Sequence, residues 1–374
     1  MSKKLMMVVN EDRFFLSHRK SLALAAHSQG WEVTIVCKDT GRRSEVEALG
    51  LPMLCLPINP TGMNLLQEAR TFFFLLRLFL CRRPDVVHLV GLKSILWGGL
   101  AARLTRVHGV VHAVSGLGVL FNSEQLSRVA RLMLRFMAFS NHRPRVSVIF
   151  QNQEDYQLFL SRGVVSSCQC SFIKGSGIDL DEYAYVAPTI TAPLRVLFTA
   201  RMVREKGVLT LIAAAQRLRS RYEGKVEFLL CGDLSNNPNG ISRNQLNELC
   251  DGHYIQWLGF RLDVPQLLRD CHIVAFPSYY REGVPRSLIE ACGVGRPIIT
   301  CRSIGCKDVV DDGVNGFLIE PRDEVALADR LCQLLDNPDL RLRMGLAGRQ
   351  KAEREFDVHL VEQAHLAIYE SVSR

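Results

Sequence analysis

Short strand-like runs alternate with helical patterns along the first half of the chain, and this alternation constrains the fold more than any other feature. The runs are rich in β-branched residues and occupy residues 5–9, 33–37, 86–89, 107–114 and 146–150. One helical pattern between them, residues 16–29, stops before Gly30, as helices that end at a glycine do. Strands that alternate with helices predict βαβ units and a parallel sheet.

The second half of the chain repeats this scheme. Its strand-like runs occupy residues 195–199, 226–230, 254–258, 273–276, 297–300 and 316–319. Residues 187–193 contain two prolines and no helical period, which is typical of a linker. We therefore expect an N-terminal domain over residues 1–186, a linker over 187–193 and a C-terminal domain over 194–374. Open parallel sheets bind ligands beyond the carboxyl ends of their strands, so we expect the site between the two domains.

Composition excludes several classes of protein. The longest apolar segment, residues 72–81, is too short to span a membrane and is interrupted by Arg77. The first residues are interpreted as a core strand and not as a signal sequence. The 12 cysteines are irregularly spaced, which favours neither a zinc site nor a disulfide scaffold and fits a reducing cytoplasm.

The positive charge lies in the first half of the chain. Of the net charge of +8, residues 1–185 contribute all, with 22 Lys and Arg against 14 Asp and Glu, while residues 186–374 carry 24 of each. Such a field indicates an anionic partner: a membrane surface, a nucleic acid or a phosphorylated substrate. No zinc, helix-turn-helix or RNA-binding sheet motif is present, so we expect no nucleic acid.

Two glutamates bracket a turn at residues 277–291. Glu282 precedes Gly283-Val284-Pro285, and Glu290 follows within the next helical pattern. Pro285 suits a helix start, where free backbone N–H groups hold phosphate or sugar oxygens. If eight helical residues separate the carboxylates, they stand about 12 Å apart, which is too far for a glycosidase pair.

A second strand end leads into a basic turn. Arg201 and Lys206 flank the start of the following helical pattern, where cations are disfavoured unless an anion accompanies them. A diphosphate would explain both residues. The chain has no phosphate-loop motif, and Gly116 and Gly118 form only part of a dinucleotide fingerprint.

Taken together, three segments resemble glycosyltransferase family 4: the turn from Arg201 to Gly207, the Glu282 and Glu290 pair, and residues 305–317. Residues 150–152 and 175–179 are similar to segments that close the family's first domain. The resemblance implies the GT-B fold, with two Rossmann-like domains facing each other across a cleft. It also implies retention of the anomeric configuration and a last helix that packs back on the first domain.

The resemblance also implies roles for individual residues. Arg201 and Lys206 would contact the donor diphosphate, Glu282 the donor sugar and Glu290 the ribose. His112 would stand at the cleft as a further catalytic residue. The remaining donor-binding residues would be Gly283, Val284, Pro285 and Leu288.

No metal cofactor is expected, because a diphosphate paired with Arg201 and Lys206 would not require a metal ion to neutralise it. The alternative is an aspartate pair, Asp179 and Asp181, with the spacing of a metal site. The first strand's loop departs from the family, since His18 and Arg19 follow it where many relatives carry a glycine-rich turn. That departure suggests that His18 and Arg19 recognise the acceptor.

A helical pattern at residues 125–141 predicts contact with a membrane. Arg128, Arg131 and Arg135 share one stripe, and apolar side chains cover most of the remaining surface. Residues 71–83 add aromatic and basic side chains. The alternative is an ordinary helix that covers the sheet and points its arginines to water.

The sequence therefore predicts an enzyme that moves a hexose or N-acetylhexosamine from a nucleotide diphosphate, UDP above all, to a glycan acceptor. The expected acceptor is linked to polyprenyl diphosphate, in the synthesis of a bacterial surface polysaccharide such as O-antigen or capsule. The enzyme would be cytoplasmic and peripheral on the inner face of the cell membrane. Two alternatives stay open: a nucleotide-sugar 2-epimerase and a non-catalytic sugar-nucleotide-binding protein.

Overall fold

The chain forms two compact units. A computed structural model describes residues 2–59, 64–118, 121, 126–188, 193–235 and 239–374. One unit comprises Met1–Ser176 with Val358–Arg374, and the other Gly177–Asp357. The boundary therefore lies before the predicted linker, because Ile178 and Tyr183 are buried in the core of the second unit. Residues 189–192 of that linker lie outside the described residues.

The first unit contains a parallel sheet in the order β3-β2-β1-β4-β5-β6-β7. Its strands are β1 (Lys4–Glu11), β2 (Glu32–Lys38), β3 (Met53–Cys55), β4 (Val86–Val90), β5 (Gly109–Val114), β6 (Val146–Phe150) and β7 (Cys170–Phe172). The five predicted strands are confirmed. The sequence pattern missed β3 and β7, which have only three residues each and show no clear period.

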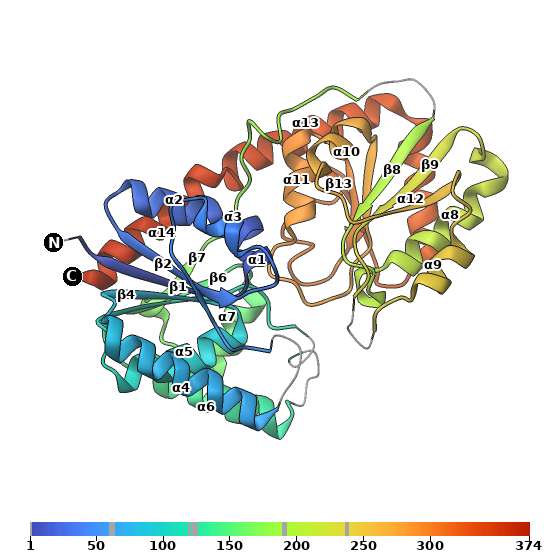
Figure 1. Cartoon of the computed structure of the whole chain (residues 1–374). Helices are drawn as coiled ribbons and strands as arrows, with labels where there is room; N and C mark the ends of the chain where they lie inside the picture. The colour runs from blue at the N-terminus through green and yellow to red at the C-terminus, as the bar shows by residue number, and fades with distance from the viewer. Residues whose placement is uncertain (1, 60–63, 119–120, 122–125, 189–192, 236–238) are drawn as a thin grey trace. The chain divides into compact units, whose positions relative to one another are not determined.

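Helices cover both faces of this sheet. They are α1 (Asp12–His18), α2 (Lys20–Ser28), α3 (Arg43–Glu47), α4 (Leu65–Arg82), α5 (Leu92–Leu104), α6 (Arg128–Asn141), α7 (Gln153–Ser161) and α14 (Val358–Ser373). Helices α4, α5 and α6 form a layer on one face, and α2 and α14 pack on the other (Figure 1). None of the described helices is both long enough and apolar enough to cross a membrane.

The predicted helix 16–29 is wrong in one respect, because the structure breaks it at Arg19. This residue has φ −133° and separates α1 from α2. Its side chain is buried, and burial lowers the pKa of Arg19 to about 10 despite the opposing effect of Tyr369. Because of this break, the side chain of Arg19 points into the interior, whereas the sequence analysis placed it where it could contact a substrate.

Helix α14 is attached to the sheet through buried polar groups. The Tyr369 hydroxyl lies 2.5 Å from Nδ1 of His88 in β4, and both side chains are fully buried. A Cβ on Gly109 would lie 2.7 Å from the carbonyl oxygen of Val372, so β5 begins directly against this helix. The last helix therefore belongs to the first unit, although the whole second unit precedes it in the chain.

The second unit contains another parallel sheet, in the order β10-β9-β8-β11-β12-β13. Its strands are β8 (Leu194–Thr199), β9 (Val226–Cys231), β10 (Ile255–Gly259), β11 (Ile273–Phe276), β12 (Ile298–Cys301) and β13 (Gly316–Ile319). All six predicted strands are confirmed. The strand order reverses between β8 and β11, and ligands of open α/β sheets bind at such a reversal.

Helices again lie on two faces. They are α8 (Val208–Tyr222), α9 (Arg243–Leu249), α10 (Val264–Asp270), α11 (Arg286–Val294), α12 (Glu324–Asp336) and α13 (Pro338–Glu355). Helices α8 and α12 pack together on one face, and α10, α11 and α13 on the other. The core between these layers is almost entirely apolar, with Phe198 and Phe276 stacked on neighbouring central strands.

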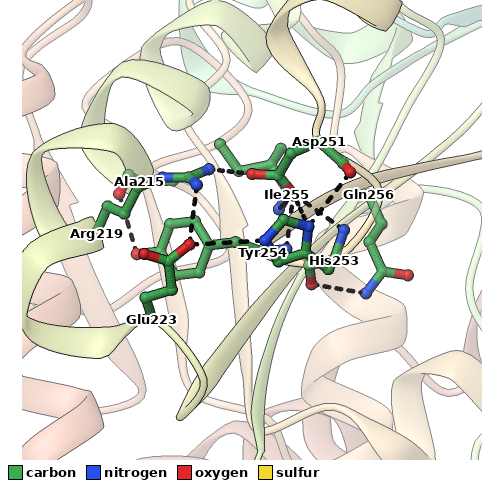
Figure 2. Close-up of polar contacts among 8 residues, drawn as sticks. All are labelled: Ala215, Arg219, Glu223, Asp251, His253, Tyr254, Ile255 and Gln256. Carbon is green, nitrogen blue, oxygen red and sulfur yellow. Dashed lines mark hydrogen bonds and ion pairs between the residues drawn. The ribbon is translucent and has the colours of Figure 1, made fainter.

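Asp251 organises the turn that enters β10. Its Oδ1 accepts hydrogen bonds from the backbone N–H groups of His253, Tyr254 and Ile255, and its Oδ2 pairs with Arg219 of α8, as Figure 2 shows. Burial alone would raise the pKa of this carboxyl, but the backbone hydrogen bonds and Arg219 hold it well below its usual value of 3.8. The ionised carboxylate therefore stabilises the start of an outer strand.

We predict that Asp251→Ala lowers the free energy of unfolding of the second unit by about 2 kcal/mol at pH 7, because three N–H donors lose their acceptor. Since the folded pKa is depressed, this contribution is present above pH 3.8 and shrinks as the pH falls below it. Urea unfolding at pH 7 and pH 3 measures both effects. Glu248→Ala, an exposed change in α9, is the matched control. A loss that did not shrink in acid would contradict the assignment.

Candidate functional site

The candidate site lies at the carboxyl ends of β8 and β11, where the strand order of the second sheet reverses. After β8 the chain forms the short 3-10 helix η3 (Arg204–Lys206) and enters α8. After β11 it passes through residues 277–285 into α11. The two basic residues and the first of the two glutamates singled out in the sequence are therefore on adjacent strand ends.

Backbone contacts hold these two segments together. The carbonyl oxygen of Glu205 accepts hydrogen bonds from the N–H groups of Tyr279, at 2.9 Å, and Tyr280, at 3.2 Å. Gly207 has φ 81°, and a Cβ there would lie 2.0 Å from the carbonyl oxygen of Pro277. Only glycine permits both this conformation and this approach.

The contact brings Lys206 against Glu282. Their side chains form an ion pair and are only 15% and 14% exposed, respectively. The Ser278 hydroxyl donates to Oε1 of Glu282 at 3.3 Å, and the Lys206 ammonium lies 5.4 Å from the centre of the Phe276 ring. Lys206 is thus a fixed, partly desolvated cation, and such a charge acts more strongly on a bound anion than one in water.

Arg201 lies beside this pair. It is exposed, and its side chain makes no hydrogen bond or ion pair with the described part of the chain. Its charge lowers the pKa of Tyr280, although burial and Glu282 raise that pKa on balance. Arg201 is therefore near the Lys206 and Glu282 pair and available to an anionic ligand.

The segment from Gly283 to Pro285 is buried and crosses the loop after β12. A Cβ on Gly305, which has φ 83°, would lie 1.7 Å from the carbonyl oxygen of Gly283. Ser303 donates to the carbonyl oxygen of Ser278 at 2.6 Å. Residues 305–317, noted in the sequence, thereby support the loop that carries Glu282.

Two expectations about this segment need correction. Leu288 is fully buried in the core, and its N–H donates to the carbonyl oxygen of Pro285, so neither group is available to a donor. Helix α11 begins at Arg286, so Glu282 lies in the preceding loop. The separation of about 12 Å, which assumed a continuous helix between the glutamates, therefore does not apply.

Glu290 lies inside α11 in a buried polar group. It is 7% exposed, and its Oε1 accepts hydrogen bonds from Nε of Arg286 at 2.7 Å and from the Tyr183 hydroxyl at 2.9 Å. Burial raises the pKa of Glu290, while Arg286 and Tyr183 oppose the rise. Its contact with a ribose stays a prediction, and the structure adds a role in fixing α11 to the segment around Tyr183.

His112 is not at a strand end. Strand β5 continues to Val114, and the ring is fully buried, with no hydrogen-bond partner for either nitrogen among the described residues. A Cβ on Gly99 of α5 would lie 2.9 Å from the ring, and burial lowers the pKa of His112 to about 3. This burial in the helix-covered core argues against the predicted catalytic role.

The acceptor candidates His18 and Arg19 differ. Arg19 is only 2% exposed, and its Nη1 donates to the carbonyl oxygen of His18, so its predicted contact with an acceptor is not supported. His18 is half-buried, stacks on Phe14 and has Nδ1 2.7 Å from the Ser17 hydroxyl. His18 thus stays a candidate.

The strand order of the first sheet reverses between β1 and β4, and sequence analysis missed the residues there. Asn10, the second-last residue of β1, accepts a hydrogen bond from the Ser94 hydroxyl at 3.0 Å. Gly91, directly after β4, has φ 85°, and a Cβ there would lie 3.1 Å from the Asn10 amide. The feature of the sequence that could have identified this position is a glycine directly after a strand-like run.

The aspartate pair closes a local turn. Oδ1 of Asp179 accepts hydrogen bonds from the N–H groups of Asp181, at 2.9 Å, and Glu182, at 3.3 Å. Within the described residues, no group of three or more His, Cys, Asp or Glu side chains is placed to hold a metal ion. Independence of metal stays a prediction.

The helix predicted to contact a membrane is α6. It begins at Arg128, capped by Ser127, and residue 125 of the prediction lies outside the described residues. Arg128, Arg131 and Arg135 are exposed, as expected. The same exposed side also carries apolar residues, namely Val129, Leu132, Phe136 and Phe139, which are 40–51% exposed. The helix therefore both covers the sheet, through Met133 and Met137, and presents a mixed basic and apolar surface.

Solved structures share this architecture. The Anabaena protein HepE, solved in complex with UDP, superimposes with a TM-score of 0.79 over 99% of this chain and 100% of that one, at 21% identity. Sucrose-phosphate synthase from Thermosynechococcus elongatus gives 0.80 over 99% of both chains at 20% identity. The fold is GT-B.

Sequence comparison then identifies the family. The model described as "Glycosyl transferase 4-like" matches residues 4–152, and the one described as "Glycosyl transferases group 1" matches residues 193–337. The chain belongs to these glycosyltransferases, so both the predicted family and the predicted fold class are confirmed.

Two curated relatives match nearly the whole chain. An N,N'-diacetylbacillosaminyl-diphospho-undecaprenol alpha-1,3-N-acetylgalactosaminyltransferase from Campylobacter jejuni is 24% identical over 96% of this chain and 98% of its own length. A UDP-Gal:alpha-D-GlcNAc-diphosphoundecaprenol alpha-1,3-galactosyltransferase from Escherichia coli is 24% identical over 88% of this chain and 87% of its own.

We predict that Lys206→Ala lowers turnover by about 100- to 1,000-fold, which is the loss expected when one fixed charge that stabilises a transition state is removed. Arg204→Ala is the matched control, since Arg204 lies in the same short helix but is exposed. Steady-state transfer rates of the two folded variants make the comparison. Equal, small losses in both would show that Lys206 does not act on the donor.

Proposed function

We propose that this glycosyltransferase moves a hexose or N-acetylhexosamine from UDP to a glycan carried on polyprenyl diphosphate, in the assembly of a bacterial surface polysaccharide. The observation that carries the donor half of the proposal is the fixed pair of Lys206 and Glu282 at the reversal of the second sheet, with Arg201 beside it. Two cations and one carboxylate suit a sugar attached to a diphosphate. The cations would bind the phosphate oxygens, and the carboxylate would accept hydrogen bonds from the hydroxyl groups of the sugar.

In the proposed mechanism, Arg201 and Lys206 stabilise the negative charge that develops on the diphosphate as its bond to the sugar breaks. Glu282 accepts hydrogen bonds from donor-sugar hydroxyls, and Ser278 and Lys206 hold its carboxylate in place. The proposed reaction retains the anomeric configuration. Phosphate oxygens of the leaving group take the proton from the acceptor hydroxyl.

The curated relatives support the acceptor half of the proposal. The names of both relatives describe transfer to a sugar on diphospho-undecaprenol, and the name of one gives UDP-Gal as donor. The exposed basic and apolar side of α6 supports the same acceptor, because an enzyme that uses a lipid-linked glycan works at a membrane surface.

A transfer assay tests this proposal. Purified protein is incubated with radiolabelled UDP-galactose, UDP-glucose and their N-acetyl derivatives, each with an N-acetylhexosaminyl-diphospho-polyprenol. We expect one donor to label the lipid and no donor to change when the acceptor is omitted. Epimerisation of the free donor without acceptor would support the 2-epimerase alternative, and absence of both reactions would support a binding protein.

The same assay tests dependence on metal. We propose that no metal cofactor takes part, so turnover should persist in excess EDTA, with less than about a twofold change. Loss of turnover that Mg²⁺ or Mn²⁺ specifically restores would contradict this and would make Asp179 and Asp181 candidates for binding the ion.

We further propose that α6 docks the enzyme, as a peripheral protein, on the anionic inner face of the cell membrane. Arg128, Arg131 and Arg135 are spaced so that they lie on one side of the helix, where Leu132 and Phe136 are also exposed. Arginines would contact lipid headgroups while the apolar side chains enter the interface.

We predict that replacing Arg128, Arg131 and Arg135 with glutamate releases the protein from vesicles of phosphatidylglycerol and phosphatidylcholine. Each basic residue near an anionic surface contributes about 1 kcal/mol, so the loss should be several kcal/mol. Reversal of Arg217, Lys225 and Arg343, which are exposed in the second unit, is the matched control. Transfer to a short, water-soluble acceptor should persist in both. Unchanged co-sedimentation of the α6 variant would leave α6 as a helix that only covers the sheet.

A further inference from the structure

The first unit has a basic recess at the edge where β5 and β6 begin. It is an open hollow of about 430 Å³, lined by Arg103, Arg106, Arg143, Arg145 and His108, with one valine and one proline. Arg103 lies in the last turn of α5 and Arg106 follows that helix, while Arg143 and Arg145 lie in the turn between α6 and β6. This edge is opposite the carboxyl ends of the strands, so the recess is separate from the ends of β1 and β4 described above.

No acidic side chain in the lining of the recess balances these residues. Within the described chain, none of its four arginines forms an ion pair with an Asp or Glu side chain, whereas several arginines elsewhere in the protein do. Its lining contains no carboxylate. Four guanidinium groups around one hollow repel each other unless an anion lies among them.

Structural roles account for only part of the cluster. Arg143 donates to the carbonyl oxygens of Ala102, at 3.2 Å, and His108, at 3.1 Å, and so caps the carboxyl end of α5. Arg103 lies 5.4 Å from the centre of the Phe139 ring. Arg106, in contrast, is exposed and makes no hydrogen bond, ion pair or ring contact with the described residues.

Arg145 is also available for a ligand. It is exposed, and the single hydrogen bond that its side chain makes with the described chain runs from Nη2 to the backbone oxygen of Arg374 at 3.3 Å. Burial, and next the charge of Arg103, lower the pKa of Arg143, which shows that the like charges affect each other. Arg106 and Arg145 thus line the recess from two separate turns with most of their donors free.

We propose that this recess binds a phosphate group, through Arg106 and Arg145 with Arg103 and His108 beside them. Guanidinium groups present planar pairs of N–H donors that match phosphate oxygens, and several of them around one hollow favour phosphate over a halide. The phosphate belongs either to a phospholipid headgroup or to a small soluble ester. The lipid source has one argument on its side: Arg103 stacks on Phe139, which is 51% exposed on the side of α6 proposed to meet the membrane.

Hydrogen exchange measured by mass spectrometry tests the proposal, because it separates the recess from the donor site in the second unit. The full-length protein is compared with and without inorganic phosphate at constant ionic strength, and with vesicles of phosphatidylcholine with or without phosphatidic acid. The test variant carries Arg106→Gln and Arg145→Gln. The matched control carries Lys20→Gln and Arg162→Gln, two exposed cations of the same unit that do not line the recess.

We expect phosphate to slow exchange in peptides that span residues 103–109 and 142–146 of the native protein and of the control. In the test variant, at least about tenfold more phosphate should be needed, because two charge-assisted contacts are lost. The same protection by phosphatidic acid vesicles would support the lipid source, and protection by free phosphate alone would support a soluble ester. Absence of protection in both arms, or equal protection in the test variant, would overturn the proposal.

Discussion

The candidate donor site depends on the backbone contacts between two loops of the second unit. The carbonyl oxygen of Glu205 accepts the N–H groups of Tyr279 and Tyr280, and Gly207 lies against the carbonyl oxygen of Pro277. These contacts attach the turn after β8 to the loop after β11. The ion pair between Lys206 and Glu282 follows from them, since the two residues could not otherwise be held at a fixed separation across 76 positions of sequence.

A corresponding constraint in the first unit is the packing of the last helix, α14, on the sheet of the unit in which the chain begins. The Tyr369 hydroxyl contacts His88 in the middle of the sheet, so the last helix completes the core of the unit in which the chain begins. Arg19 is buried next to this group, with its charge close enough to lower the pKa of Tyr369, although burial raises that pKa on balance. The buried arginine contributes to the packing of α14 and not to a surface for substrate.

The positive charge of the first half of the chain has two structural locations that bear on function. Some of it lies on the exposed side of α6, mixed with apolar side chains, and some lines the recess at the opposite edge of the sheet from the strand ends. Helix α6 contains no Asp or Glu, and the lining of the recess contains none either. An anionic surface and a phosphate group are the partners that such arrangements fit, and Arg103, in contact with Phe139, connects the two.

The sequence by itself determined the two parallel α/β units and the family, because strand periodicity and the motifs around Arg201, Lys206 and Glu282 are local properties. It also placed those three residues correctly at strand ends. Only the tertiary structure decided which polar residues are accessible: His112 and Leu288 are inside the core, and Glu290 is held by Tyr183 and Arg286. The physical reason is that burial depends on which helix packs over a residue. The packing partner lies in another element of the fold, as Gly99 of α5 does for His112 of β5, and the local sequence pattern does not identify it. The basic recess was likewise invisible, since its arginines come from two turns that only the sheet brings together.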